Sequence, residues 1–316
     1  MFTKSVRKIL SLLTVLALML GVIALVQPMK AEATFAGGVL RWGVTLNDQI
    51  AVGFDMAIDG EDVVAVTVDG ADASFTKEAN EDGTYRITVA LAASQMTDAI
   101  AISVNAEALS KTYSVRKYAD VILNGDYNDV TKDLVRSMLA YGGAAQTYFG
   151  YNTESLANAG IALTLPTPAG ENTLASSGEI SGLRFYGATL LCKEKTAVRL
   201  YFNGDIQGVS FSANGKALDA EEKDGRYYVD IAGIGPAQLG GNITLTATKD
   251  TQSFTVTYSP ITYILRMYNK AESSAELKTL VQALYGYYQA AIAYTNASDE
   301  FVGEIIDEID GPVIDF

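Results

Sequence analysis

The sequence has no histidine, one cysteine, one tryptophan and few basic residues. Without histidine, the chain lacks the most common general base near neutral pH and the most common transition-metal ligand. Ser-His-Asp, Cys-His and zinc-protease mechanisms are therefore excluded. No other group of residues marks an active site, so we predict a non-catalytic protein without a cofactor.

The single cysteine, Cys192, rules out a disulfide within the chain, so the fold must depend on packing. Cys192 ends the apolar run 188–192, which favours a buried and unreactive thiol because free cysteine packs as a small hydrophobic residue. The alternative is a disulfide to another chain.

Basic residues are outnumbered, with 23 Lys and Arg against 37 Asp and Glu and a net charge of −14. A surface of this sign repels nucleic acid and anionic lipid, so we expect neither as a partner. The acidic residues are spread along the chain, which is typical of a soluble extracellular protein.

The N-terminus has the order of a secretory signal peptide. Three basic residues precede an apolar run over 9–26, and Ala31-Glu32-Ala33 then places small residues at a cleavage site. A membrane anchor is the alternative, since about 18 apolar residues is the lower limit for spanning a bilayer. The small residues favour cleavage after Ala33. We predict a signal peptide over 1–33 and a secreted protein, free or held at the cell surface, with no membrane insertion after cleavage.

The rest of the chain repeats itself at a shift of about 144 residues. The clearest match aligns Asp82–Ala90 with Asp224–Ala232, a turn followed by an alternating strand. The alignment also places Gly43–Leu46 on Gly187–Leu190, and it continues through the segments near the end of each copy. A repeat of this length indicates duplication of a domain and not a short solenoid repeat.

Most of each copy consists of short runs that alternate between apolar and polar residues. Asp-Gly and Asn-Gly pairs separate the runs and suit tight hairpin turns: Asp69-Gly70, Asp82-Gly83, Asn203-Gly204, Asn214-Gly215 and Asp224-Gly225. This pattern predicts an immunoglobulin-like β-sandwich in each copy, although it does not determine the strand order.

Each copy ends in residues with helical periodicity. In the first copy, one stripe of the segment 131–149 carries Leu134, Met138, Tyr141, Ala145 and Tyr148. A shorter helix over about 116–123 precedes it, and Thr131 or Asp129 is expected to cap the longer one. The second copy predicts helices over 261–267 and 275–294, with Pro260 in the first turn. The fold class is therefore α+β, with two tandem immunoglobulin-like sandwiches that are each followed by a helical hairpin.

The expected boundaries follow from this repeat. We predict the first unit over 34–160, a linker over 161–178, the second unit over 179–296 and an acidic tail over 297–316. The linker is rich in Pro, Ser and Gly and has no periodicity. In the tail, the spacing through Ile309 suits a short amphipathic helix, and the tail either frays or docks onto the second unit or a partner.

Three phrases are similar to a tandem module of secreted and surface proteins of Gram-positive gut anaerobes. They span residues 131–142, 144–153 and 277–285, and the resemblance covers nearly all of the mature chain. It implies an extracellular, non-catalytic module that often accompanies binding or adhesive domains, and it carries over no site residues. No second recognisable domain is present here, so the two units themselves must act.

The second long helix carries more aromatic residues than the first. Tyr285, Tyr288 and Ile292 are expected to form a contact surface, because exposed tyrosine is enriched at interfaces. The alternative is packing against the sandwich or the other copy. Trp42 starts the first predicted strand and is either a core residue or a sugar-stacking residue.

Acidic loops such as Asp59–Asp62 hold oxygen ligands, but they lack the spacing of a calcium-binding loop, so we predict no metal site. The leading hypothesis is a binding protein that contacts a host protein or a surface glycan, and an immunoglobulin-binding superantigen is its most specific version. A structural component of the cell envelope or matrix is the first alternative. A glycoside hydrolase that uses two carboxylates is the second.

Overall fold

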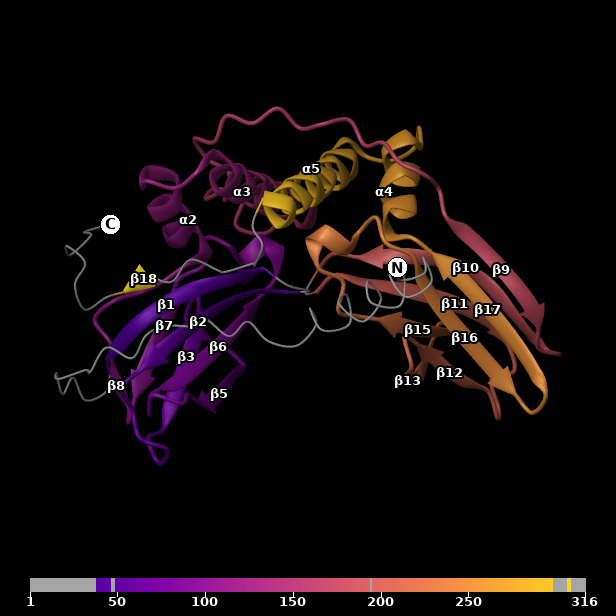
Figure 1. The fold of residues 1–316 in the computed structure, drawn as a ribbon, viewed down its shortest axis with the longest axis horizontal. Helices are drawn as coiled ribbons and strands as arrows, with labels where there is room; N and C mark the ends of the chain where they lie inside the picture. The colour runs from indigo at the N-terminus through magenta and orange to yellow at the C-terminus, as the bar shows by residue number, and fades with distance from the viewer. Residues whose placement is uncertain (1–37, 47–48, 194, 298–305, 308–316) are drawn as a thin grey trace, which may run out of the picture.

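The computed structural model describes residues 38–46, 49–193, 195–297 and 306–307. The predicted signal peptide over 1–33 lies outside these ranges. The chain is a mixed α+β protein in which four helices form one layer and antiparallel sheets lie beneath it on both sides (Figure 1). No helix in these ranges is long and apolar enough to cross a bilayer.

The first unit runs from β1 to α3 and contains two antiparallel sheets. The larger sheet has the order β18-β1-β2-β6-β5, with β18 at Ile306–Asp307, β1 at Val39–Leu46, β2 at Ile50–Met56, β6 at Tyr85–Leu91 and β5 at Phe75–Ala79. The smaller has the order β4-β3-β7-β8, formed by Ala71–Asp72, Val64–Val68, Ile100–Val104 and Glu107–Ala108. Alternate side chains of both sheets, such as Phe54 and Ile102, are buried in one core.

The second unit runs from β9 to α5 and repeats this order. One sheet is β10-β11-β15-β14, formed by Leu183–Leu191, Ala197–Gly204, Arg226–Ile231 and Ala220–Lys223. The other is β13-β12-β16-β17-β9, formed by Lys216–Leu218, Ser210–Ala213, Ile243–Lys249, Gln252–Tyr258 and Leu174–Glu179. In both units a 3₁₀ turn, at Ala93–Gln95 and Pro236–Gln238, lies between the same two strands.

Three of the predicted turns have positive φ at both residues: Asp69-Gly70, Asn214-Gly215 and Asp224-Gly225. This conformation matches the twist of the strands that the turn joins. The sequence therefore located these hairpins correctly.

The strand register shows which residues of the two units correspond. Val52 pairs with Val89 in the first unit, and Val198 pairs with Ile231 in the second. Since the alignment of Asp82–Ala90 with Asp224–Ala232 places Val89 on Ile231, β2 corresponds to β11 with Val52 at the position of Val198.

The same register corrects the alignment of the first strands. Arg41 pairs with Asp55, and Gly187 pairs with Tyr201 at the equivalent position, so Arg41 corresponds to Gly187. In both strands the register shifts one residue earlier, at Leu40 in β1 and at Tyr186 in β10. The predicted match of Gly43 with Gly187 is therefore wrong by two residues, because an extra bulge residue is invisible to a comparison of sequences.

The helices are α2 (Val115–Asn124), α3 (Asp129–Phe149), α4 (Pro260–Asn269) and α5 (Ala275–Ala297). Asn128 caps α3, its Oδ1 accepting a hydrogen bond from the Thr131 amide at 2.8 Å. The expectation that Thr131 or Asp129 caps this helix is thus wrong by one residue or more. Pro260 does begin α4, as predicted.

Most of the predicted stripe on α3 is buried, including Met138 and Tyr141. Tyr148 is the exception at 39% exposed, because it lies in the last turn of α3, just before the helix ends at Gly150. The periodicity therefore located the buried face but extended it one turn too far.

The helices of the two units pack against each other through α3 and α5. The rings of Tyr141 and Tyr287 stack with centroids 6.0 Å apart, and both residues are buried. Each sandwich thus contributes one long helix to a shared interface, which joins the two units.

The predicted linker over 161–178 is wrong as a flexible spacer. Residues 174–178 belong to β9, which pairs with β17. The preceding residues cross the helical layer (Figure 1), where the Leu165 carbonyl accepts a hydrogen bond from Gln282 and the Thr173 amide donates to Thr262. Composition indicated a lack of periodicity, but the segment packs because the helices beneath it offer polar partners.

The C-terminal segment includes a short strand. Ile306–Asp307 forms β18, which pairs antiparallel with β1 so that Asp307 lies opposite Arg41. The helix expected through Ile309 is therefore wrong at these two residues. They dock onto the first unit, whereas the sequence suggested the second unit or a partner.

Candidate functional site

The predicted contact surface on α5 is not a surface. Tyr285 is only 7% exposed, and its ring lies 5.9 Å from that of Tyr288. Tyr288 is half-buried, with its hydroxyl packed against Gly240, and Ile292 is half-buried as well. Packing, the alternative weighed from the sequence, explains the additional aromatic residues of this helix.

Trp42 is also a core residue, at 4% exposed. Its ring lies 5.1 Å from Tyr113 and 5.7 Å from Tyr118 in edge-on contacts, and it stacks near Phe54. A sugar could not reach either face, so the sugar-stacking interpretation is wrong.

The outward face of the β10-β11-β15-β14 sheet has a composition that sequence periodicity did not single out. Arg184 pairs with Asn203, and Arg226 pairs with Lys223. Because Phe202 pairs with Tyr227, Asn203 and Arg226 are neighbours as well. These four residues, Arg184, Asn203, Arg226 and Lys223, form one transverse line that we call the cationic row. Its three steps between strands span about 14 Å.

A row of tyrosines lies beside the cationic row. Tyr201 pairs with Tyr228, their ring centroids are 6.3 Å apart, and the bulge residue Tyr186 lies at the end of the row. Tyr186 is 56% exposed, and the Arg226 guanidinium lies over its ring at 4.1 Å. The bulge places Tyr186 outward beside Gly187, where strict alternation along β10 would not have placed both.

The third row of this face is an ion pair. Arg199 donates two hydrogen bonds to Asp230, both 2.7 Å long, and its guanidinium lies 3.7 Å from the centre of the Tyr228 ring. The hydrogen bonds to Asp230 raise the pKa of Arg199 further above its usual value. The Tyr228 hydroxyl donates a hydrogen bond to Glu221, which raises the pKa of Tyr228. Arg199 is thus paired, whereas the cationic row has no ion pair among the residues that the structure describes.

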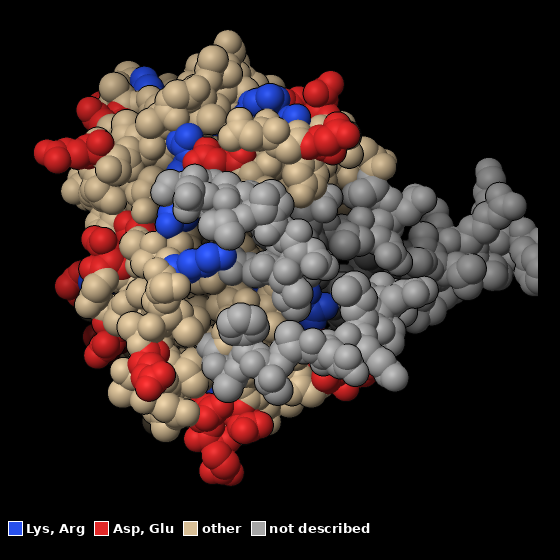
Figure 2. All heavy atoms as spheres, turned by 90° about the vertical axis from the view of Figure 1, so that its left-hand side faces the viewer, with Lys and Arg blue, Asp and Glu red and all other residues tan. Residues whose placement is uncertain are grey.

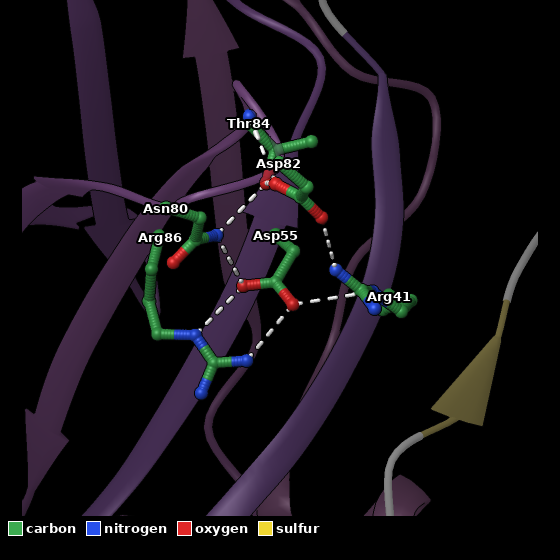
Figure 3. Close-up of polar contacts among 6 residues, drawn as sticks. All are labelled: Arg41, Asp55, Asn80, Asp82, Thr84 and Arg86. Atoms are coloured by element: carbon green, nitrogen blue, oxygen red, sulfur yellow. Dashed lines mark hydrogen bonds and ion pairs between the residues drawn. The ribbon is translucent and has the colours of Figure 1, made fainter. Parts of the chain in front are cut away.

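The corresponding face of the first unit is closed by charged side chains. Asp55, only 3% exposed, accepts hydrogen bonds from Arg86 at 2.7 and 2.9 Å and from Asn80 at 3.2 Å, and it forms an ion pair with Arg41 at 3.2 Å (Figure 3). Arg41 continues the network to Asp82, which the Thr84 amide and hydroxyl also contact. The network leaves no apolar ring open to solvent.

Position by position, the two faces have exchanged their chemistry. Asp55 occupies the position of Tyr201, and Arg86 occupies that of Tyr228. Gly53 occupies the position of Arg199, and the Arg86 guanidinium lies over this glycine. Both sheets therefore place a guanidinium at the same point, but only the second surrounds it with tyrosines.

Oppositely charged residues mix on the first unit's outer surface. Figure 2 shows acidic side chains around this face with basic side chains between them. Among the residues described, no group of three His, Cys, Asp or Glu is placed to hold a metal ion. In the loop at Asp59–Asp62, the Lys77 ammonium donates hydrogen bonds to three backbone carbonyl oxygens at 2.8 to 3.2 Å, so a cationic side chain already binds the oxygens that calcium would need.

A narrow hollow of about 430 Å³ lies between the units, beneath α3 and α5. Tyr141, Cys192 and Tyr287 line it, and it has room for only a few water molecules. Burial raises the pKa of the Cys192 thiol to about 12, although a hydrogen bond with Tyr141 lowers it in part. This environment agrees with the prediction of an unreactive thiol.

We therefore expect Cys192 to be protected from alkylation at pH 8. In the folded protein, iodoacetamide should react at least about 100-fold more slowly than after unfolding in urea, because a thiol of such high pKa contains little thiolate. Mass spectrometry of timed reactions measures both rates. Equal rates would show that the thiol is exposed and ionises normally.

The chain was compared with family models, with curated proteins and with solved structures. No family model and no curated protein matches. Among solved structures, a chimeric titin Z1Z2-Z1Z2 tandem that carries a GRGDS peptide from fibronectin matches over 70% of this chain and 96% of its own, at 12% identity. Its TM-score of 0.19 is too low to support an argument about function.

Proposed function

We propose that this chain is an extracellular, non-catalytic binding protein that contacts a macromolecular partner through the outward face of the β10-β11-β15-β14 sheet. The observation that carries the proposal is the exposed ring of Tyr186, held under Arg226 at the end of the cationic row. Tyrosine and arginine are the residues most enriched among those that dominate binding energy at interfaces. Three cations grouped together are also unusual in a chain whose net charge is −14.

The architecture supports the same role. We infer that the chain is a duplicated pair of immunoglobulin-like sandwiches, each followed by a helical hairpin, as the repeated element order favours. The likeness to modules of secreted proteins of Gram-positive gut anaerobes points to the same setting. Host proteins, antibodies among them, and surface glycans are the partners to test first.

The test compares two exposed tyrosines. Immobilised immunoglobulins, mucin and a glycan array are probed with the wild-type protein, with Tyr186→Ser and with Tyr148→Ser. Tyr148 is the matched control, because it is also exposed but lies on α3, away from the sheet. Loss of an interface tyrosine should weaken binding by about 10-fold or more, and Tyr148→Ser should leave it unchanged. Equal binding by both variants, or no saturable binding at micromolar protein, would contradict the proposal.

Both alternatives predict other results. A structural envelope or matrix component would fractionate with the cell wall and show no saturable binding. A hydrolase would need an accessible carboxyl group with a raised pKa to act as the acid. Among the carboxyl groups with a resolved shift, burial raises the pKa of Asp98, but this residue is only 1% exposed and accepts a hydrogen bond from Tyr151 at 2.6 Å. Asp98 is thus poorly placed to reach a substrate.

A further inference from the structure

We propose that the edge of β10 at Gly187–Ala188 receives an extended, acidic polypeptide segment of the partner as an added strand. This inference rests on the proposed function and specifies the chemistry of the partner. Strand addition satisfies the free N–H and C=O groups of a sheet edge, while side-chain contacts on the adjoining face provide specificity.

The first observation is the free edge itself. β10 is the end strand of its sheet, and no described strand pairs with its outer side. The bridge between Ile180 and Leu183 involves only its first residue. An exposed edge presents a row of unpaired backbone groups, which is a template for another chain.

The second observation is that the equivalent edge already binds a strand. In the first unit, Asp307 and Ile306 of β18 pair with Arg41 and Trp42 of β1. By the strand register, Arg41 and Trp42 correspond to Gly187 and Ala188. The two edge strands have the same bulge just before these positions, so the bulge does not prevent a strand from pairing there.

The third observation is space. A Cβ atom added at Gly187 would meet no atom within 4 Å. The outward face is therefore open at the point where the added strand would pass, between the exposed Tyr186 and the half-buried Tyr201. A side chain of the incoming segment could lie in this opening.

The fourth observation is charge. Arg184 and Arg226 lie in the row adjacent to Gly187, both are exposed, and neither has an ion pair among the described residues. They favour carboxylates on the incoming segment. In the first unit, the residue opposite Arg41 is likewise acidic, Asp307. An acidic glycan would also be attracted by the cations, but it would leave the backbone groups of the edge unpaired, so a polypeptide fits both features.

The test uses the full chain and a fluorescent peptide with the sequence of residues 301–310, Phe-Val-Gly-Glu-Ile-Ile-Asp-Glu-Ile-Asp. Fluorescence polarisation measures its affinity, and hydrogen exchange locates the amides that it protects. We expect protection within β10, an affinity that falls as salt is added, and at least 10-fold weaker binding by a peptide whose four acidic residues are replaced by Gln and Asn.

Matched variants keep the result interpretable. Gly187→Glu places a negative charge in open space and should weaken peptide binding at least 10-fold, whereas Gly187→Ala should bind as the wild type does. Arg184→Glu should weaken binding, and Lys216→Glu, which changes an exposed lysine of the other sheet, should not. Unchanged hydrogen exchange in the free variants confirms that they fold.

Protection confined to β1, equal affinity for the neutral peptide, or full binding by Gly187→Glu would overturn the inference. So would binding of polysialic acid at this face without any binding of the peptide. If Tyr186→Ser still abolishes binding of the macromolecular partner in that case, the proposed function survives and only the strand addition fails.

Discussion

Replacing Tyr287 with alanine is expected to lower the free energy of unfolding by about 4 kcal/mol, because it leaves a cavity in the interface that joins the two units. Tyr287 is 3% exposed and stacks on Tyr141 of the other unit. Urea denaturation followed by far-UV circular dichroism measures the change. Because α3 and α5 link the sandwiches, the variant should also unfold in two separate steps, where the wild type unfolds in fewer.

Tyr287→Phe is the matched control. The buried Tyr287 hydroxyl has no hydrogen-bond partner among the described residues, and burial raises its pKa. Removing an unsatisfied hydroxyl while keeping the ring should leave stability unchanged or raise it by about 1 kcal/mol. A loss as large as that of Tyr287→Ala would mean that the hydroxyl is bonded, and a loss below 1 kcal/mol for alanine would mean that the interface contributes little to stability.

Asp55→Ala is expected to cost about 3 kcal/mol, since removing one partner from a buried ion pair leaves the other charges uncompensated. Asp55 is the centre of the network in Figure 3, where Arg86, Arg41 and Asn80 all contact its carboxylate. The Arg86 side chain is 38% exposed, so water can solvate it in part, which places the cost at the lower end for such pairs. Thermal unfolding and urea denaturation both measure this change.

Asp82→Ala provides the comparison within the same network. Its side chain is 44% exposed, and it contacts Arg41 at 3.0 Å, so its loss should cost less than about 1 kcal/mol. If Asp55→Ala costs no more than Asp82→Ala, burial does not strengthen the network, and the outward face of the first unit is only a solvated surface.

The helices were predicted well because their signals are local. A stripe of apolar residues in α3, Pro260 at the start of α4 and the Asp-Gly and Asn-Gly hairpins each depend on a few neighbouring residues. The errors at Asn128 and Tyr148 concern helix ends, where one turn of periodicity does not distinguish a cap from a helical residue.

The candidate site was not predicted, because its position depends on pairing between distant strands. Arg184, Arg226 and Lys223 come from three separate strands and form one row only in the observed register. Tyr186 faces outward beside Gly187 because of a bulge that no sequence pattern reveals. The tyrosines of α5 had the stronger local signal, but the neighbouring helix and Gly240 cover them.

The amino-acid sequence by itself determined what this protein cannot use, since a chain without histidine and with one cysteine has no histidine-based catalysis and no internal disulfide. It also determined the order of strands and helices and the turns between them, because hairpins and amphipathic stripes depend on nearby residues. Only the tertiary structure decided which apolar faces are covered, that the segment after α3 packs onto the helices, and that one sheet edge is paired while its equivalent is free. Burial depends on which distant element arrives to cover a surface, and periodicity describes only the surface that waits to be covered.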